Sequence, residues 1–416
     1  MDKKRILIII GFLGICVLLG FAIYWVFFRK APGTTIPTQS GTQTNSGLFP
    51  ETGERDNTPI SSGQGTLPIG TGQTNNGQTT GGITGSNTIN RPNSESLITK
   101  TVDVSIGSPS PGPSGNARFY NETDGKFYTL DRNGNVRVLS DTVFYNVTKA
   151  TWSPESNESI IEYPDGSNIY YNFETNEQVT LPKHWESFSF SKEGSRITAK
   201  SMGLSPDNRW LITSDPTGSN VSLVEPLGDN ASKVMVDWSP NRQVVALSLT
   251  GDEIGGQRQE VLLVGQNHEN FKSIEVEGRG LQAQWSPQGN KLLHSVHSSR
   301  TDYKPELWIV DASPDNAGAN RKPLGVNTWA SKCTMADERT VYCGVPTTLE
   351  SGAGFAPEVA NFTPDAFYRI DTVTGIRTEL KADNAHVVDS MFVSGDGSVL
   401  YFTDKNQDGL FSIPLK

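Results

Sequence analysis

The sequence is poor in cysteine and in charged residues. Three cysteines among 416 residues are too few for a disulfide-dense scaffold. Charged residues make up 19% of the chain, below the usual quarter, and 45 acidic residues stand against 35 basic ones. A net charge of -10 argues against a nucleic-acid binder, because such a protein needs a basic surface to replace the counterions around phosphates. Few charges together with 41 Gly and 24 Pro favour β-structure with loops over long solvated helices.

Motifs of known enzyme chemistry are missing as well. Gly203-Leu204-Ser205-Pro206 lacks the second glycine of a nucleophile elbow, and no stretch of the chain is left for the α/β domain that carries such an elbow. His294 and His297 stand three apart on a predicted strand, which places them on opposite faces, so they cannot share a metal ion from that strand. We therefore expect no catalytic residues and no cofactor.

One long apolar run follows a short stub at residues 1–5. Residues 6–28 carry no charge and would span roughly 34 Å as a helix, enough to cross a bilayer core. The run is longer than a secretory h-region and no small-x-small cleavage site follows it, so an uncleaved signal anchor is expected. More positive charge precedes the run than follows it, which predicts a cytoplasmic N-terminus and an extracytoplasmic C-terminal part of a single-pass membrane protein.

Residues 29–96 have the composition of a tether. From residue 31 onward, 51 of 66 residues are Gly, Pro, Ser, Thr, Asn or Gln. Such a segment buries too little apolar surface to offset its ordering entropy, so a disordered linker is predicted. As a flexible coil its ends would lie roughly 45 Å apart.

A short pattern recurs from residue 97 to residue 416. It reads Trp-Ser-Pro at 152–154, 238–240 and 285–287, and degenerate copies begin at Phe190, Cys333 and Val393. The apolar residue ends a strand that faces a neighbouring sheet, Ser bonds the turn backbone, and Pro presets its φ angle. β-branched strands follow each copy, with a mean repeat of about 48 residues. Four antiparallel strands per repeat of this length are typical of propeller blades.

Blade number follows from the length of the repetitive region. Its 320 residues correspond to about 6.7 repeats, so seven blades are favoured over six. The chain ends after only three strands of its last blade. We expect the run 98–106 to supply the missing fourth strand, because this would close the ring and remove an exposed sheet edge.

The Trp-Ser-Pro turn carries a family resemblance, together with the runs LWIVDASPD at 307–315 and WLITSDPTGSN at 210–220. The region 97–416 resembles TolB-like, WD-repeat-like bacterial β-propellers. The resemblance implies an all-β propeller and protein partners in the cell envelope. The chain departs from TolB-like proteins because it has a predicted membrane anchor and lacks a separate N-terminal α/β domain. Propellers of this kind serve as binding platforms and also accompany peptidase domains, so the fold alone gives no activity.

Long connections between second and third strands mark a candidate contact face. They run over 250–259, 298–305 and 345–364, and in a propeller all of them emerge on one face. Aromatic and Arg side chains favour interfaces. The candidate contact residues are Arg258, Arg300, Tyr303, Phe355 and Phe362. The alternative is that these loops are tolerated insertions with no partner.

Two smaller sites remain open. Asp404, Asn406, Asp408 and Gly409 reproduce the opening of a calcium loop, but its twelfth position is Leu415, so the run is either a polar hairpin turn or a weak metal site. Cys333 and Cys343 lie on two strands joined by a turn, where they form either a disulfide or two free buried thiols.

The sequence therefore predicts a membrane-anchored propeller that binds other molecules without catalysis. Residues 97–416 hold 40 acidic and 28 basic residues, so anionic lipids and wall polymers should be repelled, and an envelope protein or a neutral glycan is expected as the partner. The alternative is a hydrolase or lyase that acts on an envelope glycan or peptide, with its site in the central channel or on the long-loop face. Converging side chains from several repeats would leave no local motif.

Overall fold

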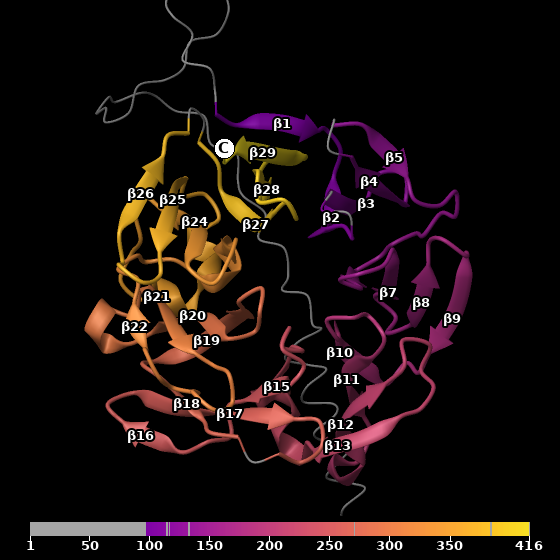
Figure 1. Ribbon diagram of the computed structural model, residues 1–416, viewed down its shortest axis with the longest axis horizontal. Coiled ribbons are helices and arrows are strands. Elements are labelled where there is room, and N and C mark those ends of the chain that lie inside the picture. Colours follow the sequence, from indigo (N-terminus) through magenta and orange to yellow (C-terminus); the bar gives the residue numbers. More distant parts are fainter. Residues whose placement is uncertain are drawn as a thin grey trace, which may run out of the picture. The chain divides into compact units, whose positions relative to one another are not determined.

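A computed structural model describes residues 97–415, except residues 114, 116, 132, 133, 270, 383 and 384. In this part the chain folds into seven antiparallel sheets, the blades, which follow one another around a central axis (Figure 1). The prediction of seven blades is thereby confirmed. The predicted stub, membrane span and linker, at residues 1–5, 6–28 and 29–96, lie outside the described residues. Within the described part, no helix has the length and apolarity to cross a bilayer.

Blades 1 to 3 are regular four-stranded sheets in which successive strands pair in chain order. The strands of blade 1 are β2 (Ile106–Pro111), β3 (Ala117–Asn121), β4 (Lys126–Leu130) and β5 (Val136–Val138). Those of blade 2 are β6 (Lys149–Trp152), β7 (Glu158–Glu162), β8 (Asn168–Asn172) and β9 (Glu177–Leu181). Those of blade 3 are β10 (Trp185–Phe190), β11 (Ile197–Met202), β12 (Arg209–Ser214) and β13 (Ser222–Pro226).

Blade 4 differs because it has five strands. They are β14 (Val234–Val236), β15 (Val244–Ser248), β16 (Glu253–Gly255), β17 (Arg258–Gly265) and β18 (Ile274–Val276). β16 and the start of β17 form a hairpin within the predicted loop 250–259. The sequence reads as a loop there because of its Gly pair, and both Gly255 and Gly256 adopt positive φ.

Blades 5 to 7 again have four strands each, and the last of them is completed from the N-terminal side. Blade 5 contains β19 (Arg279–Trp285), β20 (Lys291–His297), β21 (Pro305–Asp311) and β22 (Lys322–Pro323). Blade 6 contains β23 (Cys333–Met335), β24 (Thr340–Pro346), β25 (Asp365–Asp371) and β26 (Arg377–Leu380). Blade 7 contains β27 (Val388–Val393), β28 (Val399–Asp404), β29 (Leu410–Pro414) and β1 (Thr99–Val102).

The ring is closed by β1, which pairs antiparallel with β29. This confirms the predicted closure, with one correction. Only Thr99–Val102 adds to blade 7, whereas Ile106 already begins the first strand of blade 1. The predicted run 98–106 is therefore shared between two sheets. Ile98 and Val102 are buried against blade 7 and blade 1, so closure also completes two cores.

The Trp-Ser-Pro turn has the geometry expected from its residues. Ser239 Oγ accepts the Val244 N–H at 2.9 Å, and Ser286 Oγ accepts the Lys291 N–H at 3.0 Å, so each Ser ties the turn to the next strand. Trp152 Nε1 donates to Ser108 O of the preceding blade at 2.8 Å. In the copy predicted at Cys333, Met335 takes the Trp position instead. Ala336, the next residue, donates its backbone N–H to Thr340 O, which corresponds to the backbone bond donated by Ser in the other turns.

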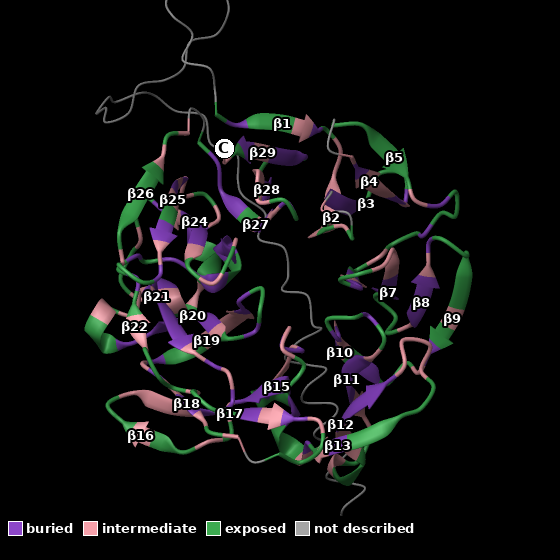
Figure 2. Cartoon of the chain, in the orientation of Figure 1, coloured by how far each residue is buried: buried purple, intermediate pink, exposed green. Residues whose placement is uncertain are grey.

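The core consists of seven apolar clusters, each shared by two neighbouring blades. Each sheet buries both of its faces, so the middle strands carry runs of buried residues. The outer strands β5, β9 and β26 are largely exposed, whereas β18 of blade 4 is buried (Figure 2). An eighth cluster of Trp329, Ala353 and Ala360 lies outside this arrangement. Ala353 and Ala360 belong to the long connection of blade 6, and Trp329 precedes η4. The described residues also contain six short 3₁₀-helices: η1 (Pro206–Asn208), η2 (Gly228–Lys233), η3 (Ser299–Thr301), η4 (Ala330–Lys332), η5 (Ala353–Phe355) and η6 (Pro357–Ala360).

Candidate functional site

The connections between second and third strands lie on the face opposite the Trp-Ser-Pro turns, and we call this the long-loop face. In blade 4 the connection is the β16–β17 hairpin, in blade 5 it contains η3, and in blade 7 it is the turn 405–409. Blade 6 carries the longest one, which we call the insertion, residues 347–364. It is closed at its base by a bond from Thr347 N to Pro364 O of 2.9 Å and contains η5 and η6.

The hairpin of blade 4 contacts the loop of blade 5. Gln257 Oε1 accepts the Ser299 N–H at 2.7 Å, and Gln257 Nε2 donates to the hydroxyl of Tyr303 at 3.3 Å. A single amide side chain thus holds both ends of the blade 5 loop. Gln257 itself adopts a positive φ of 68°, which turns the hairpin tip toward its neighbour.

The loop of blade 5 in turn holds the insertion of blade 6. Asp302 and Tyr303 both adopt the left-handed conformation, with φ of 52° and 56°. Their carbonyl oxygens accept hydrogen bonds of 2.8 Å from Gly352 N and Gly354 N. A Cβ at Gly354 would lie 2.6 Å from the Tyr303 oxygen and would also meet His297, so only glycine permits this approach. The strained loop conformation is therefore retained through contacts with the insertion.

Aromatic side chains cover the junction between blades 5 and 6. The ring of Phe355 lies 4.5 Å from the His297 ring and 5.0 Å from the Tyr303 ring, measured between centroids. Phe355 nevertheless remains 63% exposed, Val359 is 51% exposed and Phe362 is 84% exposed. Three apolar side chains on one ordered insertion thus face solvent. At its far end the insertion reaches blade 7, where Asn406 Nδ2 donates to Asn361 O at 2.7 Å.

The predicted contact residues separate into two groups. Tyr303, Phe355 and Phe362 lie on the interlocked loops, as described above. The two arginines are engaged in pairs within the chain: Arg258 Nη1 lies 3.3 Å from Glu275 Oε2 on β18. Arg300 bonds Glu306, and its guanidinium stacks over the Trp308 ring at 5.0 Å. Their charges are therefore partly neutralised within the chain itself.

A buried polar network lies beneath the insertion and joins blade 6 to blade 7. Lys332 Nζ contacts Asp365 Oδ2 at 2.8 Å, and both side chains are almost fully buried. The same Asp365 oxygen accepts the Val388 N–H at 2.7 Å. Burial raises the pKa of the Asp365 carboxyl, and the Lys332 ammonium opposes this rise. His386 Nδ1 lies 2.9 Å from Asp404 Oδ2, and this pair is also buried.

The weak metal candidates do not form a free ligand set. Asp404 Oδ2 is occupied by His386 and by the Val387 N–H at 3.0 Å, and Asp404 Oδ1 accepts the Asn406 N–H at 2.7 Å. Asp408 is exposed in the same turn. Within the described residues, no three His, Cys, Asp or Glu side chains gather in a way that fits a metal ion.

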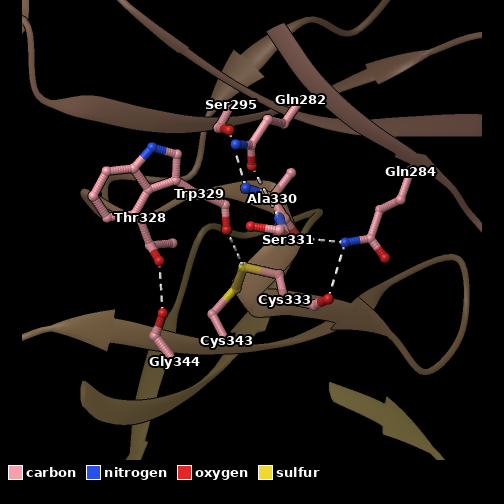
Figure 3. Close-up of a disulfide and its surroundings, with 10 residues drawn as sticks. All are labelled: Gln282, Gln284, Ser295, Thr328, Trp329, Ala330, Ser331, Cys333, Cys343 and Gly344. Carbon is pink, nitrogen blue, oxygen red and sulfur yellow. Dashed lines mark hydrogen bonds between the residues drawn. A yellow bond between two sulfur atoms is a disulfide. The ribbon is translucent and has the colours of Figure 1, made fainter. Parts of the chain in front are cut away.

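Cys333 and Cys343 are joined by a disulfide at the base of blade 6 (Figure 3). They are directly paired residues of β23 and β24, and both are buried. Gln284 of blade 5 donates from Nε2 to Ala330 O at 2.6 Å and to Cys333 O at 2.9 Å. Thr328 Oγ1 donates to Gly344 O at 2.6 Å. The strand that leads into the insertion is thus held on two sides.

His294 is fully buried. Burial lowers its pKa to about 4. Because the unfolded chain binds a proton near pH 6.5 and the folded chain does not, stability should fall as the pH drops from 6.5 to 4, by about 3 kcal/mol. We expect His294→Phe to remove this part of the acid sensitivity. Urea unfolding of both chains at several pH values measures it, and parallel pH profiles would refute it.

Sequence reasoning missed the residues that organise this face. Gln257, Gly354, Lys332 and Asp365 carry no motif, and the contacts of each one involve another blade or another strand. Each of these residues is far along the chain from the residue that it contacts, for example 33 residues between Lys332 and Asp365. The only available signal was the length of the connection 345–364, which did point to this region.

Comparisons with known proteins concern the fold. No protein-family profile and no curated protein sequence matches the chain. Among solved structures, an oligogalacturonate lyase in complex with manganese is similar with a TM-score of 0.54 and 12% identity, over 77% of this chain and 93% of that one. The β-propeller domain of Cps50 (Swd1) from Myceliophteria thermophila has a TM-score of 0.53 and 10% identity, over 77% of this chain and 100% of that one. At such identities the likeness shows a WD-repeat-like propeller fold. It gives no information about activity.

Proposed function

We propose that this protein is a membrane-tethered, extracytoplasmic propeller that binds an envelope protein through its long-loop face, without catalysis. The observation that carries the proposal is the insertion of blade 6. It holds Phe355, Val359 and Phe362 in solvent, although backbone bonds to blade 5 and a side-chain bond from blade 7 order the segment itself. Apolar side chains presented on a rigid support are typical of interface anchors.

The loops are held in a defined conformation, and this favours a binding role over tolerated insertions without a partner. The insertion is anchored by an apolar cluster in which its Ala353 and Ala360 pack with Trp329, which precedes η4. Preorganisation of this kind lowers the entropy lost when a partner binds. Gln257 and the left-handed pair Asp302 and Tyr303 extend the ordered surface across blades 4 to 6.

The location of the propeller outside the cytoplasm is part of the same proposal. The uncharged run 6–28 and the Gly- and Thr-rich segment after it support an anchor and a tether. The disulfide between Cys333 and Cys343 is consistent with an oxidising compartment. The resemblance to TolB-like propellers supports a protein partner in the envelope, and the acidic balance of residues 97–416 disfavours anionic polymers.

An enzyme acting in the central channel is the rival proposal, and one residue favours it. Asp237 follows the first strand of blade 4, and burial raises its pKa to about 7, which suits a general acid or base. The ammonium of Lys149 on the first strand of blade 2 opposes this rise in pKa. No hydrogen bond or ion pair links this carboxyl to another described residue, so it has no orienting partner such as a catalytic pair would need.

Labelling in intact cells tests the compartment and the contact face together. Val359→Cys leaves both phenylalanines in place, and a membrane-impermeant maleimide photocrosslinker attached there should capture a protein on irradiation. Lys192→Cys, exposed in the turn between the first two strands of blade 3, is the matched control on the opposite face. The chain without these substitutions controls for other thiols. We expect labelling at both positions and a protein adduct from position 359 alone.

A second substitution makes the test specific to the docked insertion. Gly354→Val in the Val359→Cys chain keeps the exposed side chains but should displace the insertion from blade 5, so the adduct should fall at least severalfold while the thermal midpoint changes little. Absence of labelling at both positions contradicts the proposed compartment. Equal adducts from positions 192 and 359 contradict the proposed face.

A further inference from the structure

A cavity of about 390 Å³ opens where the insertion meets blade 7. Its walls come from the tip of the insertion, from the turn after β28, from the segment before β2 and from β27. The volume lies in the range of small-ligand pockets. The residues that matter below are Asn361, Phe362, Asp389, Asp404, Lys405 and Asp408. The cavity lies on the long-loop face, beside the exposed side chains of the insertion.

The aromatic wall of this cavity is held in place. Asn406 Nδ2 donates to Asn361 O at 2.7 Å, which ties the residue before Phe362 to the turn of blade 7. Asn406 N in turn donates to the buried Asp404. The phenyl ring of Phe362 is 84% exposed, so its face is free for a ligand. A rigid aromatic ring at the rim of a polar cavity can stack on a planar or cationic group.

The charge of the cavity is negative. Asp389, Asp404 and Asp408 contribute three carboxylates, whereas Lys405 contributes one ammonium, which lies 2.7 Å from Asp389. Asp404 is committed to His386, but Asp408 forms no hydrogen bond or ion pair with any described residue. An unpaired carboxylate beside an exposed aromatic ring favours a cation over a neutral or anionic ligand.

We propose that this cavity receives an arginine or lysine side chain of the bound partner. The cation would stack on Phe362 and form a charge-assisted hydrogen bond with Asp408, while its aliphatic stem lies along the Phe362 ring. This inference rests on the proposed function, because the partner that covers the insertion would present the side chain. A net charge of -10 on the whole chain would also attract a basic partner.

The test uses the full chain with 4-fluorophenylalanine at position 362, whose fluorine resonance reports on the ring. Three probes are titrated: arginine amide and its neutral isostere citrulline amide, both with the α-amino group acetylated, and cellotriose as a neutral saccharide. We expect a saturable shift with arginine amide alone, weakened by added salt. Asp408→Asn should raise its Kd about tenfold. Asp207→Asn, which removes an exposed charge from a blade 3 loop of the same face, should leave Kd unchanged.

Each remaining outcome overturns the inference. An equal response to citrulline amide would mean that charge is not recognised. A response to cellotriose would assign the cavity to a glycan. If no probe gives a response, the cavity has no ligand among these classes. The photocrosslinking at position 359 separates this failure from that of the proposed function. If the adduct persists undiminished in the Asp408→Asn chain, the long-loop face still binds a partner, but not through this cavity.

Discussion

Deleting residues 97–102 should destabilise the propeller by about 3–6 kcal/mol and broaden or abolish its cooperative unfolding. The deletion removes Ile98 and Val102, which are buried in the cores of blade 7, and each such side chain contributes about 1.5–3 kcal/mol. In the unaltered chain β1 pairs with the edge of β29, and the deletion leaves this edge unpaired. Thermal and urea unfolding of the full-length chain measure the effect.

A matched control for the closing strand is a deletion of six residues from the predicted linker, at 80–85. It shortens the chain equally but leaves every described strand in place, so its unfolding should match that of the unaltered chain. If both deletions leave the thermal midpoint unchanged, β1 does not close the ring. Increased self-association of the 97–102 deletion is a further expected result, because an open sheet edge can pair with another chain.

Replacing Lys332 with methionine should cost about 3–5 kcal/mol of unfolding free energy. The substitution keeps most of the side chain's volume but leaves the Asp365 carboxylate buried without its partner at 2.8 Å. Burial already raises the pKa of Asp365, and loss of the ammonium removes the influence that opposes this rise. The deficit should therefore shrink as the pH falls and Asp365 takes up a proton in the folded state.

Two controls identify the cause of this loss. Lys332→Met combined with Asp365→Asn removes both charges while an amide oxygen can still accept the Val388 N–H, so most of the stability should return. Lys405→Met breaks an ion pair of similar length with Asp389, but that pair is partly exposed and should cost less than about 1 kcal/mol. Equal losses for Lys332→Met and Lys405→Met would show that burial of the pair has no energetic consequence.

Much of the fold could be predicted because its signals are local. Most blades repeat an apolar residue, a Ser-containing turn and a β-branched strand within about 48 residues. The predicted Trp-Ser-Pro turns at 152–154, 238–240 and 285–287 each join the first and second strands of a blade in the structure. Errors arose where pairing decides the structure. The residues of β16 read as a loop, and only the start of β17 makes them a strand.

The sequence predicted which loop forms the candidate site, but it did not predict which side chains contact one another there. Loop length pointed to 345–364, and Phe355 and Phe362 are exposed there. The prediction that Arg258 and Arg300 share this surface overlooked their partners, Glu275 and the pair Glu306 and Trp308. Those partners stand at least six residues away in the sequence, so neither loop length nor residue type could indicate that the guanidiniums are already engaged.

By itself, the sequence determined a seven-bladed ring and the place of its longest loop, because turn chemistry and strand patterning act between near neighbours along the chain. Tertiary structure alone decided that Gly354 meets Tyr303, that Lys332 is buried beside Asp365, and that Phe362 borders the cavity of blade 7. These contacts join separate loops or neighbouring blades. They depend on how the sheets pack around the axis. The residues in contact follow no repeating pattern in the sequence, so the sequence alone does not indicate these contacts.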